Sequence, residues 1–484
     1  MKKLQFIRNN QLVELENVPA SRTLLDILRE DLRATSCKEG CGEGDCGACS
    51  VVLADINPQG QLAYKAVNAC IRLASSVQGM ALWTAQDIAG SNGADVESTE
   101  LHPVQQAMVS NHASQCGFCT PGFVMSLFAL YQTEVKQGKS ITRADAQHAL
   151  SGNLCRCTGY RAITEAAIAL KTDPQFSIDE SALIQKLVPL QQNLSVEDFL
   201  KLRHSHPEAQ LVAGTTDVGL WINKLHKNYE VVHDITKVTE LKGVTSDEQV
   251  LHIGAAVDLE TAFVAMQLDR PELKNFAHRF AGLPVRNSGT LGGNVANGSP
   301  IGDSMPLLIS LGSTVSLARW DGQAKQTRVM PLEKLYLGYR KNVFLPDEVL
   351  THIHIPKPRA NEFSRVYKVS KRFEDDISAV CLAIKIELEN GLVRSVSIGA
   401  GGVAAVPARA VKSEAMLLGK PWNADTVHAG KASLQSEFSP ISDMRASQDY
   451  RQMMLGQLLW RFWLETQGQS KITLADITVV EELL

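Results

Sequence analysis

One glycine-rich stretch of the chain reads Gly40-Cys41-Gly42-Glu43-Gly44-Asp45-Cys46-Gly47-Ala48-Cys49. Its three thiols have the spacing C-x4-C-x2-C, and a fourth follows at Cys70. In this spacing one loop supplies three thiolates to a 2Fe-2S cluster and a later segment supplies the fourth. The glycines allow positive φ angles and bring backbone N–H groups near the sulfurs, where they stabilise an anionic cluster. A zinc knuckle and buried structural thiols are the alternatives; zinc ligands usually come in closely spaced pairs, so the spacing favours iron–sulfur ligation by Cys41, Cys46, Cys49 and Cys70.

The residues around this stretch predict a small α+β domain over residues 1–88. Two short apolar segments flank Asn9-Asn10, a pair that is typical of a hairpin turn. Ser21 or Thr23 can cap a short helix that follows. Strand-like segments at 50–53 and 66–71 come next, and the second one carries the fourth cysteine. This mixture of hairpin, helix, loop and strands resembles the β-grasp ferredoxins.

A second group of cysteines lies in a helical region over residues 89–170. Its two pairs stand in Gln115-Cys116-Gly117-Phe118-Cys119-Thr120-Pro121-Gly122 and in Asn153-Leu154-Cys155-Arg156-Cys157-Thr158-Gly159-Tyr160. We expect Thr120 to cap a helix with Pro121 at its first position, and Thr142 to form a capping box with Asp145. Each cysteine pair then sits at a helix junction, so a four-helix bundle would bring Cys116, Cys119, Cys155 and Cys157 together at one end.

A single CxxC also suits a thioredoxin-like or a zinc site. No βαβ pattern surrounds this one, which argues against thioredoxin, whereas a four-cysteine zinc site stays open. Two metal sites in succession on one chain favour an electron relay.

Composition excludes several classes of function. The 48 basic and 52 acidic residues give a net charge of −4, so no basic field invites nucleic acid. No apolar run approaches the ~20 residues of a membrane span, and the first one ends at Arg8, too short for a signal peptide. We therefore expect a cytoplasmic protein with reduced thiols. In that setting the ten cysteines favour metal ligands over disulfides, with Cys37 and Cys381 outside both patterns.

The two cysteine motifs together resemble the iron–sulfur half of the xanthine dehydrogenase family of molybdenum hydroxylases. The resemblance implies that Cys41, Cys46, Cys49 and Cys70 hold an outer 2Fe-2S cluster, nearer a flavin. It implies that Cys116, Cys119, Cys155 and Cys157 hold an inner cluster, nearer molybdenum. Gln115 would lie toward the pterin of a molybdenum cofactor on a neighbouring polypeptide.

Two small-residue segments follow a polar stretch, residues 171–193, which we interpret as a linker. The first, Leu211–Val218, reads as a strand running into a turn whose exposed N–H groups suit a pyrophosphate. It is not the Rossmann fingerprint, which needs G-x-G-x-x-G opening a helix. The second segment, Thr290–Asn294, has glycines that permit close approach by a ligand. On the residues alone, a pair of tight loops packed on each other is the alternative.

These segments resemble the FAD domain of the same family, of the vanillyl-alcohol-oxidase type, which we place at residues 194–360. The segment Lys371–Ile377 resembles the mobile loop beside the flavin, whose charges govern the approach of nicotinamide. The resemblance implies FAD contacts by Leu211, Val212, Ala213, Gly214, Thr215, Thr216, Asp217, Val218, Phe280, Thr290, Leu291, Gly292, Gly293, Asn294, Asp303, Leu350 and Lys368.

The last part of the chain, residues 361–484, predicts an α+β domain. Apolar and charged residues alternate over 380–388, Asn390-Gly391 predicts a turn, and a second strand follows at 392–398. An apolar helix is expected over 450–464. This part resembles the C-terminal flavoprotein domain of the family, so the whole chain predicts a multidomain α+β fold.

The resemblance implies an oxidoreductase subunit of the xanthine dehydrogenase class with no catalytic residue of its own beyond the flavin. Electrons from hypoxanthine or xanthine would enter at molybdopterin on a partner subunit, pass through two 2Fe-2S clusters to FAD, and leave on NAD+. No molybdopterin domain is present in this sequence, so we expect a molybdenum-binding large subunit as partner, in a dimer of heterodimers. The alternatives are the equivalent subunit of an aldehyde or N-heterocycle hydroxylase and, from another class, a zinc-binding scaffold.

Overall fold

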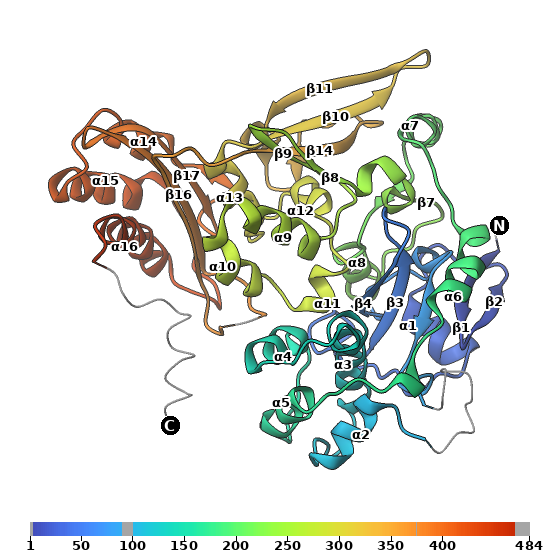
Figure 1. Cartoon of the computed structure of the whole chain (residues 1–484). Helices are drawn as coiled ribbons and strands as arrows, with labels where there is room; N and C mark the ends of the chain where they lie inside the picture. Colours follow the sequence, from blue (N-terminus) through green and yellow to red (C-terminus); the bar gives the residue numbers. More distant parts are fainter. Residues whose placement is uncertain (1–2, 90–99, 374, 470–484) are drawn as a thin grey trace. The chain divides into compact units, whose positions relative to one another are not determined.

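A computed structural model describes residues 3–89, 100–373 and 375–469 of the chain (Figure 1). By their internal contacts the residues form two compact units. Unit 1 contains Met1–Ser195, Glu208–Thr239 and Ala281–Thr290. Unit 2 contains Val196–Pro207, Glu240–Phe280 and Leu291–Leu484. Both cysteine motifs therefore belong to one unit, together with two short segments from later in the chain.

The N-terminal part of unit 1 is a five-stranded mixed sheet. Its strands are β1 (Leu4–Arg8), β2 (Gln11–Leu15), β3 (Ser50–Ile56), β4 (Leu62–Asn68) and β5 (Ala81–Trp83), in the order β2-β1-β5-β3-β4. Strands β1 and β5 are parallel and the other neighbours are antiparallel. The predicted hairpin is confirmed, and Asn9 and Asn10 both have positive φ, as a type I′ turn requires.

A short helix closes one face of this sheet. Thr23 caps α1 (Leu24–Asp26) in a capping box with Asp26, which confirms one of the two predicted caps. The helix continues as a π-helical turn to Asp31. The predicted strand at 66–71 is wrong at its end, because β4 stops at Asn68 and Cys70 lies in the turn beyond it.

Four helices follow in unit 1, and they are α2 (Pro103–Ser110), α3 (Thr120–Thr133), α4 (Arg143–Leu150) and α5 (Arg161–Ile168). Each contacts two of the others, which confirms the predicted bundle. The capping box of Thr142 and Asp145 is also confirmed. The predicted cap at Thr120 is wrong: Thr120 is already the first residue of α3, and its hydroxyl is hydrogen-bonded to that of Ser114 at 2.7 Å.

The remaining α-helices and strands described in unit 1 come from all three of its stretches. They are α6 (Glu180–Leu187), β6 (Gln210–Val212), α8 (Val218–Leu225), β7 (Val232–Asp234) and α11 (Leu283–Arg286). Strands β6 and β7 form a small parallel pair. The segment predicted as a linker thus contains a helix, α6, whose first turn is capped by Asp179.

One half of unit 2 is an antiparallel sheet with the order β11-β10-β14-β9-β8. Its strands are β8 (Val244–Ser246), β9 (Val250–Gly254), β10 (Thr314–Trp320), β11 (Lys325–Pro331) and β14 (Val349–Pro356). A short antiparallel pair, β12 (Tyr336–Gly338) and β13 (Lys341–Asn342), lies between β11 and β14 in the sequence. The helices of this half are α7 (Val196–Ser205), α9 (Leu259–Asp269), α10 (Lys274–His278), α12 (Leu291–Asn297) and α13 (Ser304–Leu311).

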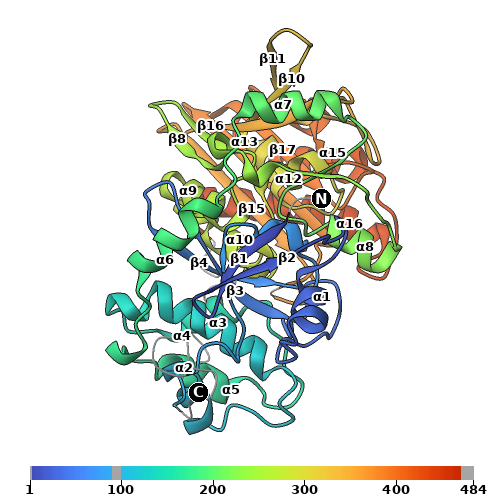
Figure 2. The ribbon, with the colours of Figure 1, turned by 90° about the vertical axis from the view of Figure 1, so that its right-hand side faces the viewer.

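The other half of unit 2 is a second antiparallel sheet, in the order β15-β16-β17-β18. Its strands are β15 (Glu362–Val369), β16 (Val380–Glu389), β17 (Leu392–Gly401) and β18 (Ala408–Arg409), and its helices are α14 (Val411–Leu417), α15 (Ala424–Glu437) and α16 (Gln448–Thr466). This sheet lies between α13 and the layer formed by α14, α15 and α16 (Figure 1, Figure 2). The predicted strand pair, its turn and the late apolar helix are therefore confirmed. Among the described residues, no helix is both long and apolar enough to cross a membrane.

Candidate functional site

The four thiols of the first motif converge in unit 1. The Cys41 thiol interacts with those of Cys46 and Cys70, and Cys70 in turn interacts with Cys49. Backbone N–H groups of Glu43 and Cys46 donate to the Cys41 sulfur at 3.4 Å each. Hydrogen bonds from Cys46, then from Cys70, hold the pKa of the Cys41 thiol far below its ordinary value. The loop thus aims two backbone N–H donors at the Cys41 sulfur.

Two glycines of this loop leave no room for a side chain. Gly44 has a φ of +82°, and a Cβ there would lie 2.4 Å from the Ile71 side chain. A Cβ on Gly40 would lie 2.7 Å from the Cys46 sulfur. The glycines quoted in the sequence therefore serve the close approach of the loop to its own sulfurs and to the segment after Cys70.

The four thiols of the second motif also converge. Cys119 interacts with Cys155, and Cys157 interacts with Cys116 and Cys155. Burial raises the pKa of the Cys119 thiol to about 12, whereas Cys116 and Cys157 are exposed. Within the described ranges no group of three or more His, Cys, Asp or Glu side chains is arranged to hold a metal ion as a single centre. A 2Fe-2S cluster instead spreads four thiolates over two irons.

Thr158 is a donor that the sequence motif contained but that we did not single out. Its backbone N–H and its hydroxyl both donate to the Cys155 sulfur, at 3.4 Å and 3.2 Å. The Cys155 N–H donates in turn to the Tyr160 hydroxyl at 2.9 Å. Donors on a ligand sulfur stabilise its negative charge, so this part of the motif is built for an anionic group.

The two thiol sets are joined by direct backbone contact. The Leu154 N–H donates to the Cys46 carbonyl at 3.0 Å, and the Asn153 amide donates to the Gly47 carbonyl at 3.2 Å. A Cβ on Gly47 would lie 2.4 Å from the Gly152 carbonyl oxygen. The segments that carry the two thiol sets are therefore hydrogen-bonded directly to each other.

Cys37 lies outside both sets, as predicted. Its buried thiol donates to the Cys49 carbonyl at 3.3 Å, and burial raises its pKa well above the ordinary value. Cys381 is likewise fully buried, in β16. Both thiols are thus held in the protonated form by their surroundings.

The first small-residue segment lies in unit 1, where β6 ends at Val212 and a turn leads into α8. Gly214 packs so closely on residue 288 that a Cβ would lie 1.8 Å from the Ser288 carbonyl oxygen. Thr215 has a φ of +59° and its hydroxyl donates to the Ile71 carbonyl at 3.0 Å. The predicted strand and turn are therefore confirmed, and the turn touches the residue that follows Cys70. Of the other predicted FAD contacts, Leu211, Ala213, Thr216 and Asp217 are half-buried here, while Val218 and Thr290 are buried.

The other predicted FAD residues belong to unit 2. Leu291, Gly292, Gly293 and Asn294 form the first turns of α12, and a Cβ on Gly292 would lie 2.5 Å from the Ala255 carbonyl oxygen. Asp303, buried at the start of α13, accepts hydrogen bonds on one oxygen from Lys368 at 2.7 Å and Ser378 at 2.8 Å. Phe280 packs edge-on against Phe276 and at a tilt against Phe263, and Leu350 is buried in β14. Ser378 was not among the site residues predicted from the sequence.

One buried arginine, Arg279, forms hydrogen bonds to the end of β15 and to the segment that follows it. Arg279 donates to the carbonyls of Lys368 and Phe373, each at 2.9 Å, and to the Ser370 hydroxyl at 3.1 Å. The Arg279 guanidinium also lies over the Phe373 ring, 5.0 Å from its centroid. The predicted mobile loop includes Glu374, which lies outside the described residues.

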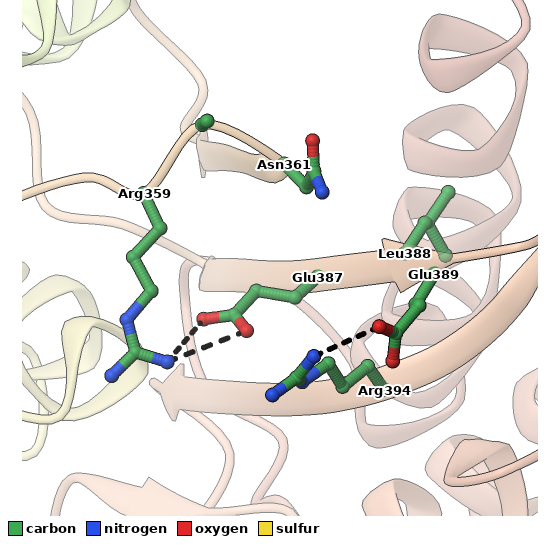
Figure 3. Close-up of a pocket in the computed structure, with 7 residues that line it drawn as sticks. Arg359, Asn361, Glu387, Leu388, Glu389 and Arg394 are labelled. Carbon is green, nitrogen blue, oxygen red and sulfur yellow. Dashed lines mark hydrogen bonds and ion pairs between the residues drawn. The ribbon is translucent and has the colours of Figure 1, made fainter.

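One shallow pocket of about 230 Å³ lies elsewhere in unit 2 (Figure 3). Two ion pairs line it, Arg359 with Glu387 and Arg394 with Glu389, each at 3.1 Å. None of the predicted site residues lines this pocket. We assign it no role in the chemistry.

Four family models match consecutive parts of the chain. They describe a 2Fe-2S iron–sulfur cluster binding domain (residues 6–74), a 2Fe-2S binding domain (88–168), an FAD binding domain in molybdopterin dehydrogenase (187–358) and a CO dehydrogenase flavoprotein C-terminal domain (365–466). The chain belongs to the xanthine oxidase family of molybdenum hydroxylases. It is the 2Fe-2S and FAD-binding, electron-transfer part of such a protein, and the predicted multidomain α+β fold class is confirmed.

Relatives in this family carry the name xanthine dehydrogenase. The protein of Drosophila pseudoobscura pseudoobscura is 30% identical over 533 residues, which cover 96% of this chain and 39% of the relative. Xanthine dehydrogenase 1 of Arabidopsis thaliana is 28% identical over 532 residues, covering 92% and 38%. The chain thus spans about 40% of the length of these relatives.

Among solved structures, the chain resembles carbon monoxide dehydrogenase from Hydrogenophaga pseudoflava. The match has a TM-score of 0.52 and 26% identity, and it covers 56% of this chain and 94% of that one. The similarity supports a fold shared across members of the molybdenum hydroxylase family. The domain limits and ligand residues expected from the sequence stay predictions.

Proposed function

We propose that this chain is the electron-transfer subunit of a xanthine dehydrogenase. It carries electrons from hypoxanthine or xanthine, oxidised at molybdopterin on a partner subunit, through two 2Fe-2S clusters to FAD and then to NAD+. The observation that carries the proposal is that two four-thiol sets meet in one unit through the Leu154–Cys46 hydrogen bond. We assign the outer cluster to Cys41, Cys46, Cys49 and Cys70, and the inner cluster to Cys116, Cys119, Cys155 and Cys157.

The donor sets fit these clusters. Each set offers four thiols, and each includes a sulfur that accepts at least two hydrogen bonds from the chain. When bound, the clusters carry single electrons, and the flavin accepts single electrons and releases a pair as hydride. The protein supplies the N–H and O–H donors and the buried surroundings that set the potentials.

Exposure and contacts support the order of the relay. Cys116 and Cys157 of the inner set are exposed, as is Gln115, so this end can receive electrons from another subunit. The outer set is followed at once by Ile71, whose carbonyl accepts the Thr215 hydroxyl of the proposed FAD loop. A single hydrogen bond therefore connects the residue after Cys70 to the segment that we propose for FAD.

For FAD we assign the same residues that the resemblance implies, in both small-residue segments. Gly214 packs against the Ser288 carbonyl with no room for a side chain, and a turn of small residues of this kind suits a diphosphate. Outside these two segments, the buried Asp303, oriented by Lys368 and Ser378, is a fixed polar group of the kind that orients a ligand. NAD+ as acceptor, a molybdenum-binding large subunit, a dimer of heterodimers and a cytoplasmic location complete the proposal.

The decisive experiment is co-purification of the chain with its molybdenum subunit, followed by assay of substrates and acceptors. We expect hypoxanthine and xanthine to reduce NAD+, with flavin and iron–sulfur absorbance in the complex. Reduction by an aldehyde or an N-heterocyclic acid but not by purines would instead assign another molybdenum hydroxylase. Bound zinc without iron, labile sulfide or flavin would contradict an electron carrier altogether.

A separate prediction concerns Thr158. Replacing Thr158 with valine removes the hydroxyl donor to the Cys155 sulfur and keeps the side-chain shape. A hydrogen bond of about 1 kcal/mol favours the reduced, more negative cluster, so its loss lowers the inner-cluster potential by roughly 40 mV. A redox titration followed by EPR measures the shift, and Thr158→Ser, which keeps the donor, should stay near the wild-type potential. An unchanged potential in the valine variant would show that the backbone donors suffice.

A further inference from the structure

Helix α8 reaches the outer thiol set with two consecutive side chains. The Asn223 amide nitrogen donates to the Cys70 carbonyl at 2.7 Å and to the Gly42 carbonyl at 2.9 Å. The next residue, Lys224, donates from Nζ to the Cys41 carbonyl at 2.6 Å. These three carbonyls belong to the two separate segments that carry the thiols, although the donors lie 153 to 183 residues further along the chain.

The rest of α8 is fixed against the same domain. A Cβ on Gly219 would lie 2.2 Å from the Ile71 carbonyl oxygen, so the helix touches the backbone beside Cys70. Leu220 packs against the apolar core that includes Cys49 and Cys70. The helix begins directly after the turn to which we assign the FAD diphosphate. One short rigid element therefore connects the proposed FAD turn to both ligand-bearing segments.

We infer that Asn223 is a positioning residue for the outer cluster, an inference that rests on the cluster assignment proposed above. A primary amide has two N–H hydrogens, so one side chain can hold two carbonyls at once. Here it ties the segment of Cys70 to the loop of Cys41, Cys46 and Cys49. Asn223 thereby completes the cage around the cluster and fixes that cage to the FAD turn, without contacting the iron itself.

The test uses two substitutions in the complete enzyme with its molybdenum subunit. Asn223→Asp loses both donors and sets a carboxylate against two carbonyl oxygens beside an anionic cluster. We expect the oxidised-to-reduced ratio of the outer cluster, at a fixed solution potential, to rise about tenfold, which is 59 mV for a one-electron couple. Asn223→Leu removes the donors without adding charge, and we expect release of outer-cluster iron to a chelator to become roughly tenfold faster.

Both measurements are read per cluster by EPR-monitored titration, with the inner signal identified as the one that Cys116→Ser changes. The matched control is Asn228→Asp, the same charge change at an exposed asparagine just past the end of α8; it should behave as wild type. Complete loss of the outer signal with the inner one intact, in either variant, also supports the inference.

Three results would overturn it: wild-type outer-cluster values in both Asn223 variants, equal shifts in the two clusters, or the same outer-cluster shift in the Asn228 control. A wild-type chain that holds no iron–sulfur cluster is a different result. It would remove the proposed function itself.

Discussion

Replacing Cys116 with serine is expected to leave FAD bound and to abolish its reduction by purine. Cys116 is an exposed member of the set that we propose for the inner cluster, and its thiol interacts with that of Cys157. A serine hydroxyl is a poor ligand for iron, so the inner cluster is lost or altered. Replacing a group that only hydrogen-bonds to a metal ligand already lowers metal affinity or activity by about 10–100-fold. Replacing a ligand itself should cost more, so we expect purine-driven flavin reduction to fall by at least about 100-fold. Anaerobic mixing with hypoxanthine, followed at the flavin absorbance, measures it.

The same variant should still accept electrons at its other end. With NAD+ as the proposed acceptor, NADH would reduce the flavin directly, so NADH-driven reduction of FAD should be unchanged when purine-driven reduction is lost. Cys37→Ser is the matched control, because it makes the same substitution at a thiol outside both sets, and a hydroxyl can still donate to the Cys49 carbonyl. Normal flavin reduction by purine in Cys116→Ser would rule out the relay order.

The grouping of the cysteines into two sets could be predicted because the signals for it are local in the sequence. Ligand spacing, glycine content and helix junctions all lie within a few residues of each thiol, and the structure brings together both predicted sets. The capping box at Thr142 was predictable for the same reason. Thr120 is of a residue type that often caps helices, but the N-cap position of α3 is taken by Cys119. The Thr120 hydroxyl is hydrogen-bonded to that of Ser114 instead.

What could not be predicted are the contacts between distant segments. Asn223 is an ordinary polar residue in a helix, and only the fold places its amide between Gly42 and Cys70. Residues 208–239 and 281–290 likewise read as parts of a later domain, yet their contacts place them in the unit that holds both thiol sets. Ser378 carried no signal of its own, because its role depends on Asp303, 75 residues earlier. The local spacing of the cysteines predicts two thiol sets, whereas the residues that position them become visible only through contacts between distant segments.

Replacing Lys368 with methionine is expected to cost the flavin part of the protein about 3–5 kcal/mol of stability, because it leaves a buried carboxylate without its cation. Asp303 and Lys368 are only 5% and 4% exposed at the side chain, and the Ser378 hydroxyl alone cannot neutralise Asp303. Unfolding in urea, followed by far-UV circular dichroism so that the readout does not depend on flavin binding, should therefore occur at a much lower urea concentration than in the wild type. The control is Arg394→Met, which breaks the Arg394–Glu389 ion pair drawn in Figure 3. Both side chains of that pair are more than half exposed, at 60% and 56%, so its loss should cost about 0.2–1 kcal/mol. Equal effects of the two substitutions would show that the Lys368–Asp303 pair contributes no more than a surface pair, and Asp303 would then have to hold its position through Ser378 and the backbone of α13.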